Sequence, residues 1–502
     1  MKKILLSFLL LSCVFSYSQT LVPDNSFGDN GTARFSRNEF YPNRGLLVNN
    51  NYFFMSTQSI GKINYNGQIV TGFGTNGFLN LNIPNETVTL TNFVFENNYF
   101  YIYGKIKNNS TANENMYIAK IDPNGNFDSS FGTNGIFKTD LGANESISSV
   151  VVESDGGLYC VGSKYSPSKM IHFKVNPNGT LNTAFSPNGY KEINSSFSTL
   201  GASIIRYNNG YLLIGTIAIP ANNTTHPEMI IVNVNGDGNV QTNFGNSGIK
   251  QVKFNSSEYF FTANINDIQF TDNKLFVNYE YAFSSNYMGS NLLIYNLENN
   301  ITVYNENQSQ NFYFIVDSSI YTTEFCPRCC FMSMCTSSYN LNKKNLDGTA
   351  EVSFHINGSY NYSFVYSTHP WTANNGSSLS RVIIKDDNGK FLIGGYVTAP
   401  YGIQGFSLLR VEPGVLGVND NKFKTFALYP NPFDDELNFQ SDNPVKSLEI
   451  YDLTGRMLNK PISRYENGIT TFSTYNITEK GTYIVKILTS EEKVIIRKVI
   501  KK

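Results

Sequence analysis

MYIAKIDPNGNFDSSFGTNG occupies Met116 to Gly135, and close variants of this stretch recur along the chain. MIHFKVNPNGTLNTAFSPNG spans Met170 to Gly189, and MIIVNVNGDGNVQTNFGNSG spans Met229 to Gly248. Shorter forms are KINYNGQIVTGFGTNG at Lys62 to Gly77 and DNSFGDNG at Asp24 to Gly31. A repeat of this length predicts a structural unit that is stacked on copies of itself.

Each repeat predicts four short strands in a constant order. An outer segment such as Gly135 to Leu141 comes first, followed by strands like Ser146 to Glu153 and Leu158 to Gly162. The fourth strand is the Met-x-x-x-Lys-Ile stretch, which ends in a Pro-Asn-Gly turn where proline fixes one dihedral and glycine accepts a positive one. We expect the outer segment to join the sheet of the strands that follow it.

The number of units can be counted in two ways. A polar turn followed by an apolar strand occurs seven times, near residues 50, 97, 156, 209, 272, 317 and 388. The aromatic residue of the closing motif recurs at Phe27, Phe73, Phe131, Phe185 and Phe244, and a degenerate copy is at Phe354. Four strands per period favour propeller blades over a helical solenoid. The sequence therefore predicts an all-β fold with a seven-bladed β-propeller of four-stranded blades over residues 20–414.

The two ends of this repeat region complement each other. The last repeat ends at Glu412-Pro413-Gly414 without an aromatic-glycine motif, whereas the chain opens with that motif at Asp24 to Gly31. We expect the first residues to dock on the last blade, because ring closure removes exposed sheet edges.

The N-terminus and the charge balance restrict the location and the partners. Residues 1–19 combine two lysines, an apolar run and a polar exit, which is typical of a secretory signal peptide. Leu10 to Cys13 also resembles a lipoprotein cleavage box, so lipidation of Cys13 is an alternative to ordinary cleavage near Gln19. No other stretch is apolar enough to span a membrane.

The 38 basic and 39 acidic residues nearly cancel, which disfavours nucleic acid as a partner.

The repeat is absent from the end of the chain. Residues 415–425 are predicted to form a linker, and residues 426–502 contain regularly spaced strands, among them Ser447 to Tyr451, Ile469 to Ser473 and Thr482 to Leu488. Such spacing in a short segment predicts a small C-terminal β-sandwich.

Two resemblances extend these predictions. The Lys-Ile-Asp-Pro-Asn-Gly-x-x-Asp-x-x-Phe-Gly-x-x-Gly pattern resembles the delta-60 repeat of bacterial surface and secreted proteins, which implies a propeller and no particular activity. The C-terminal segment resembles the type A sorting domain of the type IX secretion system. The residues that carry this second resemblance are Tyr429, Pro430, Asn431, Pro432, Asp452, Gly455, Gly481, Tyr483 and Lys498. It implies recognition by the type IX secretion machinery, removal of the domain, and release from or attachment to the outer surface of a Bacteroidetes-like bacterium.

Four cysteines lie within ten residues, at Cys326, Cys329, Cys330 and Cys335. One or two disulfides that bridge a long hairpin are the simplest interpretation for an exported protein. A metal site and a redox-active pair remain alternatives, although the spacing is wrong for a zinc knuckle and nothing resembles a thioredoxin. Cys160 lies on an apolar strand and is expected to be a core residue.

Other polar residues have structural interpretations that compete with functional ones. Asp122, Asn124, Asn126 and Asp128 alternate as calcium ligands do, but turn formation explains them better. His172 replaces isoleucine of the sister repeats and is expected to be buried and hydrogen-bonded. The glycines that recur late in equivalent strands, Gly104, Gly162, Gly215 and Gly394, are attributed to close strand packing rather than to a ligand.

No nucleophile, metal or phosphate-binding motif was found, so no cofactor and no catalytic or metal-ligating residue is predicted. The sequence favours a secreted or surface-displayed binding protein, whose ligand is an unidentified extracellular glycan or protein. The alternative is an exported hydrolase or lyase that acts on a glycan or peptide with carboxylates from different blades at the channel mouth.

Overall fold

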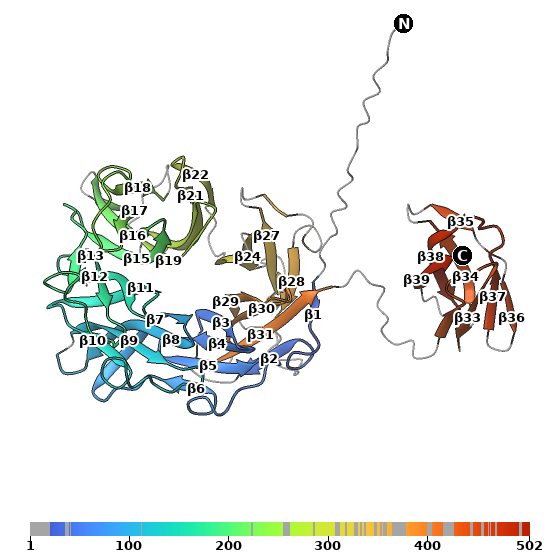
Figure 1. Cartoon of the computed structure of the whole chain (residues 1–502), viewed down its shortest axis with the longest axis horizontal. Helices are drawn as coiled ribbons and strands as arrows, with labels where there is room; N and C mark the ends of the chain where they lie inside the picture. Colours follow the sequence, from blue (N-terminus) through green and yellow to red (C-terminus); the bar gives the residue numbers. More distant parts are fainter. Residues whose placement is uncertain are drawn as a thin grey trace, which may run out of the picture. The chain divides into compact units, whose positions relative to one another are not determined.

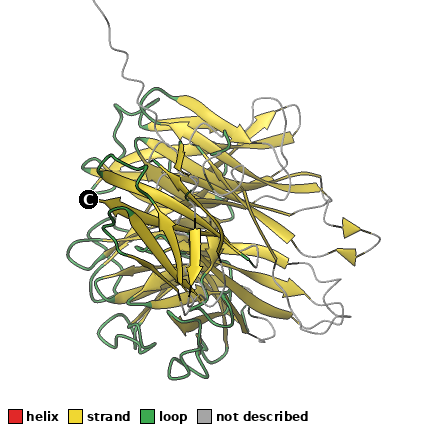
Figure 2. Cartoon of the chain, turned by 90° about the vertical axis from the view of Figure 1, so that its right-hand side faces the viewer, coloured by secondary structure: helices red, strands yellow, loops and turns green. Residues whose placement is uncertain are grey.

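A computed structural model of the chain describes residues 21–414 and 426–502, apart from short internal gaps. These gaps are 36–39, 41, 112, 222–223, 255–261, 285–286, 307–311, 317–318, 326–329, 332–333, 336–337, 346–348, 352–353, 355–358, 364–377, 399–403, 442–444, 453–455, 460, 462, 467–468 and 491–493. The described residues form strands and loops without a helix, which confirms the all-β class (Figure 2). The chain divides into two compact units, Met1–Pro413 and Gly414–Lys502.

The described part of the first unit contains seven sheets of four or five strands (Figure 1). Sheet 1 has β3 (Arg44–Val48), β4 (Asn51–Met55), β5 (Ser59–Asn64) and β6 (Phe78–Asn80). Sheet 2 has β7 (Glu86–Glu96), β8 (Tyr99–Asn108), β9 (Glu114–Ile121) and β10 (Ile136–Thr139). Sheet 3 has β11 (Asn144–Val152), β12 (Leu158–Tyr165), β13 (Lys169–Val175) and β14 (Tyr190–Glu192). Sheet 4 has β15 (Thr199–Tyr207), β16 (Gly210–Ala221), β17 (Thr224–Asn235) and β18 (Ile249–Lys253).

The remaining sheets follow the same antiparallel order. Sheet 5 has β19 (Thr262–Thr271), β20 (Lys274–Ser284), β21 (Tyr287–Asn296) and β22 (Ile301–Glu306). Sheet 6 has β23 (Phe312–Val316), β24 (Ser319–Phe325), β27 (Ser338–Lys344) and β28 (Ser359–Ser363). Sheet 7 has β29 (Ser378–Lys385), β30 (Phe391–Thr398) and β31 (Gln404–Pro413), together with β1 (Leu21–Pro23) and β2 (Thr32–Phe35). A separate hairpin of β25 (Cys330–Phe331) and β26 (Met334–Cys335) lies between β24 and β27 in the chain.

The predicted phase of the repeat was wrong. The outer segment after each motif was assigned to the following sheet, but β10 pairs with β9 of the preceding sheet. The physical reason is the motif itself: Gly135 N donates to Phe131 O at 2.9 Å, and Lys120 N donates to Gly135 O at 2.9 Å. This tight turn returns the chain alongside β9, where it forms β10 as the edge strand of the same sheet. The chain then crosses to the next sheet after β10 and not after β9.

The first residues of the chain complete the last sheet. β1 pairs with β31 from Leu21↔Pro413 to Pro23↔Val411, and β2 pairs with the same strand from Thr32↔Leu409 to Phe35↔Phe406. This pairing confirms the predicted docking of the N-terminal motif on the last repeat. It covers an edge of β31 that would otherwise be open to other strands.

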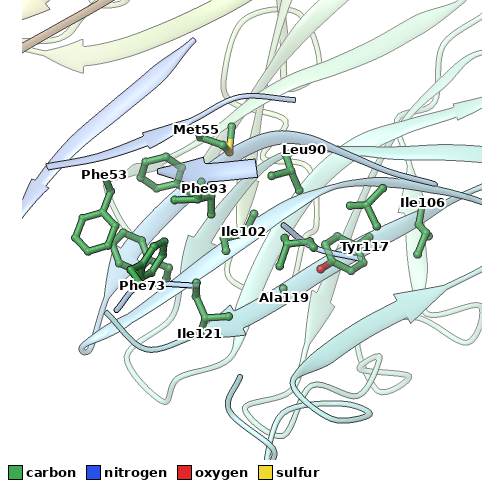
Figure 3. Close-up of a cluster of buried hydrophobic side chains, with 14 of the residues drawn as sticks. Phe53, Met55, Phe73, Leu90, Phe93, Ile102, Ile106, Tyr117, Ala119 and Ile121 are labelled. Atoms are coloured by element: carbon green, nitrogen blue, oxygen red, sulfur yellow. The ribbon is translucent and has the colours of Figure 1, made fainter. Parts of the chain in front are cut away.

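Each sheet of the first unit packs against the next one. β4 contacts β7, and β11, β15 and β19 each contact three strands of the sheet before them. β23 contacts β21, β29 contacts β23, and β3 contacts β29, so sheet 7 also packs against sheet 1. Figure 3 shows one of these interfaces, where Phe53 and Met55 of sheet 1 pack with Phe93 and Ile102 of sheet 2.

The repeated motif supplies a second contact between neighbouring sheets. Phe73 is 1 % exposed, and a Cβ atom added to Gly125, in the turn that follows β9 of sheet 2, would lie 3.0 Å from its ring. Gly132 N donates to Asn178 O at 2.8 Å in the same relationship one sheet further on. Gly67 lies against Phe27 and Gly238 against Phe185 in the same way, so the repeated motif makes this contact between successive sheets from sheet 7 through sheet 1 to sheet 4.

The second unit contains two further four-stranded sheets. One has β32 (Phe426–Tyr429), β33 (Glu436–Ser441), β36 (Ser463–Glu466) and β37 (Ile469–Ser473). The other has β34 (Val445–Tyr451), β35 (Met457–Asn459), β38 (Gly481–Thr489) and β39 (Val494–Lys501). Both contribute to one apolar cluster, for example through Phe439 and Phe472 of the first and Ile450 and Val485 of the second.

Candidate functional site

β-Bulges mark the first strand of several sheets at equivalent positions. The register shifts between Leu90 and Asn92 in β7, between Ile147 and Ser149 in β11, and between Gly201 and Ser203 in β15. β19 and β29 have the same irregularity. Bulges re-aim side chains and are frequent beside functional sites.

A glycine in the second strand stands opposite each of the first three bulges. A Cβ atom at Gly104, Gly162 or Gly215 would lie 2.1, 2.1 or 1.9 Å from a backbone carbonyl oxygen of the first strand. Only glycine allows the two backbones to approach this closely. The interpretation of these glycines as packing residues is therefore confirmed at these three positions. Each glycine allows the bulged first strand to pack closely against the second strand.

The bulged strands surround a cavity of about 400 Å³, called the bulge cavity below. Its lining comes from β3, β7, β11, β15 and β19, and includes residues of β8, β12 and β16. Hydroxyl and amide side chains of the lining that make no hydrogen bond to the described protein include Thr91, Ser148, Ser203, Thr216, Asn264 and Asn266. The cavity is thus a polar site to which five sheets contribute.

Arg44 is the cation of this lining, and it connects strands that are distant in sequence. Its Nη2 donates to the backbone oxygen of Asn266 in β19 at 2.5 Å, and its Nη1 donates to Asn43 O at 3.1 Å. Its Nε atom is buried and has no partner among the described residues. The guanidinium therefore ties sheet 1 to sheet 5 and retains unused donor capacity.

Asp267 follows Asn266 in β19 and supplies the carboxylate of the described lining. No hydrogen bond or ion pair of its side chain occurs in the described part of the chain, and the residue is only half-buried. Tyr103 also lines the cavity, and its burial raises the pKa of the phenol well above the usual value, so the hydroxyl stays protonated. The lining therefore offers one cation, one anion and several neutral donors and acceptors.

The predicted cysteine cluster is described in part. Cys330 and Cys335 stand directly opposite each other in the β25–β26 ladder. Cys326 and Cys329 lie outside the described residues, as do Cys13 and the predicted signal peptide. Cys160 is free and fully buried, which confirms it as a core residue, and burial raises its thiol pKa.

His172 is a core residue and does not line the bulge cavity. It is 1 % exposed, and its Nδ1 lies 2.8 Å from the hydroxyl of Tyr159. Burial and the charge of Lys191 lower its pKa to about 3, so the ring is neutral under ordinary conditions. The prediction of a buried, hydrogen-bonded histidine is confirmed.

The carboxylates that resemble calcium ligands serve their own turns. Asp122 Oδ1 accepts the backbone N–H groups of Asn124 and Asn126 at 2.8 and 2.9 Å. Asp128 pairs with Lys120 at 2.7 Å and accepts the hydroxyl of Ser130. These contacts agree with the turn interpretation, and no group of three potential metal ligands occurs among the described residues.

One of the sorting motif residues of the second unit, Asn431, is hydrogen-bonded to its last strand, β39. Asn431, between Pro430 and Pro432, accepts the N–H of Ile500 at 2.9 Å and donates to the backbone oxygen of Lys498. The Tyr483 hydroxyl donates to Glu479 O at 2.7 Å, in the strand that begins at Gly481.

The other motif residues of this unit lie further from β39 or outside the described part. Asp452 accepts the N–H of Arg456 at 3.0 Å, and Gly455 lies outside the described residues. Tyr429 ends β32 and is 37 % exposed. A helix long and apolar enough to cross a membrane was not found in the described part of the chain.

The family comparison matches residues 427–502 to the secretion system C-terminal sorting domain. This match confirms that the C-terminal segment is a secretion sorting domain, as the sequence predicted. It indicates export by the type IX secretion system, so the protein is secreted or attached to the outer surface of the cell. No curated protein matches the chain.

Several solved structures are similar to the chain at low sequence identity. Semaphorin 2a of Drosophila has 9 % identity and a TM-score of 0.42, with 94 % of this chain and 97 % of that chain covered. PorZ, described as an essential surface component of the type IX secretion system of Porphyromonas gingivalis, has 7 % identity and a TM-score of 0.17, with coverage of 94 % and 100 %. A glycoside hydrolase has 12 % identity and a TM-score of 0.29, with coverage of 97 % and 96 %.

The residues of the bulge cavity were not predicted from the sequence. Thr91, Ser148, Ser203 and Asp267 lie in strands whose repeat positions differ from one unit to the next. The one feature of the sequence that could have located the cavity is the glycine that recurs late in the second strand of a sheet. Each of these glycines faces a bulge in the first strand, and the bulged strands line the cavity. Arg44 is in β3 and does not belong to the repeated motif, so only folding brings it to the same cavity.

Proposed function

We propose that the protein is an exported β-propeller binding protein whose ligand site is the bulge cavity. In this proposal sheets 1–7, built from delta-60-like repeats over residues 20–414, are the seven blades of a closed ring. The cyclic order of sheet contacts and the pairing of β1 and β2 with β31 support this arrangement. The cavity then lies where the first strands of the blades converge.

The observation that carries the binding function is the polar lining of the cavity. Asp267, Ser148 and Ser203 belong to three different sheets, line one space, and make no hydrogen bonds within the described protein. Unsatisfied polar groups at a concave surface cost free energy unless water or a ligand binds them. A lining of this kind favours recognition of a polar small molecule.

The same lining argues against the hydrolase alternative. Glycoside hydrolysis by two carboxylates requires a pair roughly 5–9.5 Å apart. Among the described residues of the cavity, Asp267 is the carboxylate, and no second acid accompanies it. Binding without chemical change is therefore the better supported function.

Residues 415–425 and the second unit complete the proposal. We interpret the two sheets of the second unit as a β-sandwich that the secretion machinery recognises, and residues 415–425 as the linker at which it is removed. The shared apolar cluster of the two sheets supports the sandwich. A disulfide among Cys326, Cys329, Cys330 and Cys335 and a signal peptide over residues 1–19 remain predictions of the same proposal.

The direct test incubates the purified chain with panels of oligosaccharides and peptides, and measures both retention and cleavage. The proposal expects retention of at least one compound without product formation. Accumulation of a cleavage product would favour the hydrolase, and absence of retention across both panels would contradict a binding function at this cavity.

A further inference from the structure

The chemistry of the bulge cavity restricts the class of ligand, and this inference rests on the proposed binding function. Arg44 and Asp267 give the lining one positive and one negative charge, so the described lining carries no net charge. A simple anion is therefore repelled by Asp267, and a simple cation is repelled by Arg44. The field of the cavity favours a neutral ligand.

The neutral groups of the lining are also mixed in their hydrogen-bonding character. Ser148 and Ser203 hydroxyls can donate and accept, the amides of Asn264 and Asn266 do both, and Asp267 only accepts. A hydroxyl group of a ligand likewise donates one hydrogen bond and accepts others. A ligand with several hydroxyl groups can thus satisfy this lining more fully than a ligand with donors alone or acceptors alone.

Size and apolar contacts narrow the class further. A volume of about 400 Å³ lies near the lower end of the range of roughly 300–1,000 Å³ for small-molecule sites. Val94 and Tyr165 add apolar surface to the lining, against which the C–H face of a ring can pack. A single or double ring fits these dimensions.

We propose that the bulge cavity binds a neutral saccharide of one or two rings, with Asp267 accepting hydrogen bonds from ligand hydroxyls. Arg44 fixes the position of Asp267, because its bond to Asn266 O holds the preceding peptide group of β19. Ser148 of sheet 3 and Ser203 of sheet 4, which line the same cavity as Asp267, supply further hydrogen bonds. Binding involves no covalent step.

The test titrates the full chain by calorimetry with neutral mono- and disaccharides and, separately, with amino acids and dipeptides. At least one saccharide is expected to bind, and Asp267→Asn should weaken its binding about tenfold or more. Asn264→Ala, at an exposed position of the same strand, should also weaken it. Asp237→Asn, an identical change in an exposed turn, is the matched control and should leave affinity unchanged.

The outcomes separate this inference from the proposed function. Saccharide binding that is insensitive to both Asp267→Asn and Asn264→Ala would overturn the assignment of the site. Binding of amino acids or dipeptides in place of saccharides, with the same sensitivity to Asp267→Asn, would overturn the ligand class and leave the binding function intact. Absence of binding in both panels would overturn both.

Discussion

Asp24 and Arg410, 386 positions apart in the sequence, form a buried ion pair in which Arg410 Nε donates to Asp24 Oδ2 at 2.7 Å. The Arg410 side chain is fully buried, and its guanidinium lies 4.7 Å from the centre of the Phe27 ring and 4.2 Å from that of Tyr65. Lys390 Nζ lies 2.7 Å from the same carboxylate oxygen. This contact joins the first motif of the chain to the last sheet of the first unit.

Removing the charge of Asp24 should destabilise the first unit strongly. Asp24→Asn leaves Arg410 buried without its counter-ion, and we expect a loss of about 3–5 kcal/mol in the free energy of unfolding. Urea unfolding followed by fluorescence measures this change. Glu114→Gln breaks the more exposed Lys105–Glu114 pair and serves as the control, with an expected loss of less than about 1 kcal/mol. Equal losses in the two variants would contradict the role assigned to the buried pair.

The same contact should make the protein sensitive to acid. Burial raises the pKa of Asp24, but hydrogen bonds from Lys390 and Ser26 and the charge of Arg410 outweigh it and hold the pKa well below the usual value. A lowered carboxyl pKa means that the stabilisation is complete above about pH 4 and declines as the pH falls further. The free energy of unfolding of the wild type should therefore decrease below pH 4 more steeply than that of Asp24→Asn.

His172 should contribute a different pH dependence at milder acidity. Its pKa is lowered to about 3 by burial and by Lys191, whereas an unfolded histidine titrates near 6.5. The unfolded chain therefore binds the proton first, and stability should fall between pH 6.5 and about 3 by up to roughly 1.4 kcal/mol per pH unit. His172→Gln removes the titrating group, so its unfolding free energy should vary less over this interval. An unchanged pH dependence in the variant would contradict the assignment.

The bulges can be tested through the glycines opposite them. In Gly215→Ala the new Cβ atom would lie 1.9 Å from Leu200 O, and the first strand of sheet 4 must shift to accommodate it. We expect destabilisation of about 1–3 kcal/mol. Gly236→Ala, where the added atom meets nothing within 4 Å, is the matched control and should be neutral or slightly stabilising. Thermal unfolding of both variants measures the difference.

The repeat was predictable because each copy makes the same contact. Phe73 packs on Gly125 of the next sheet, and the Gly28 and Gly132 amides bond to the equivalent turns through Asn66 and Asn178. A periodic pattern does not reveal where one sheet ends, which is why β10 was assigned to the wrong sheet. The cavity was not predictable, because neither Arg44 nor Asp267 belongs to the repeated motif. The two residues line the same cavity only after the sheets have packed together.

Export should depend on the sorting domain at residues 427–502. A chain that ends at residue 414 keeps the whole first unit and should remain inside the outer membrane of a bacterium with a type IX system. Immunoblotting of culture medium, surface-protease-treated cells and periplasm measures the distribution. Efficient appearance of the shortened chain in the medium would contradict the assignment of this unit as the export signal.

We propose that the sheets close into a ring through β1 and β31, so the most direct test is a cross-link between these strands. Val22 and Glu412 are opposite partners in the antiparallel ladder, at a spacing of about 4.5–5.5 Å between Cα atoms that suits a disulfide. The Val22→Cys, Glu412→Cys double variant should oxidise to an intramolecular disulfide that mass spectrometry detects in the folded monomer, whereas Val22→Cys with Asp155→Cys should not. Failure of the first pair to form this bond in the folded monomer would contradict ring closure by the N-terminal strands.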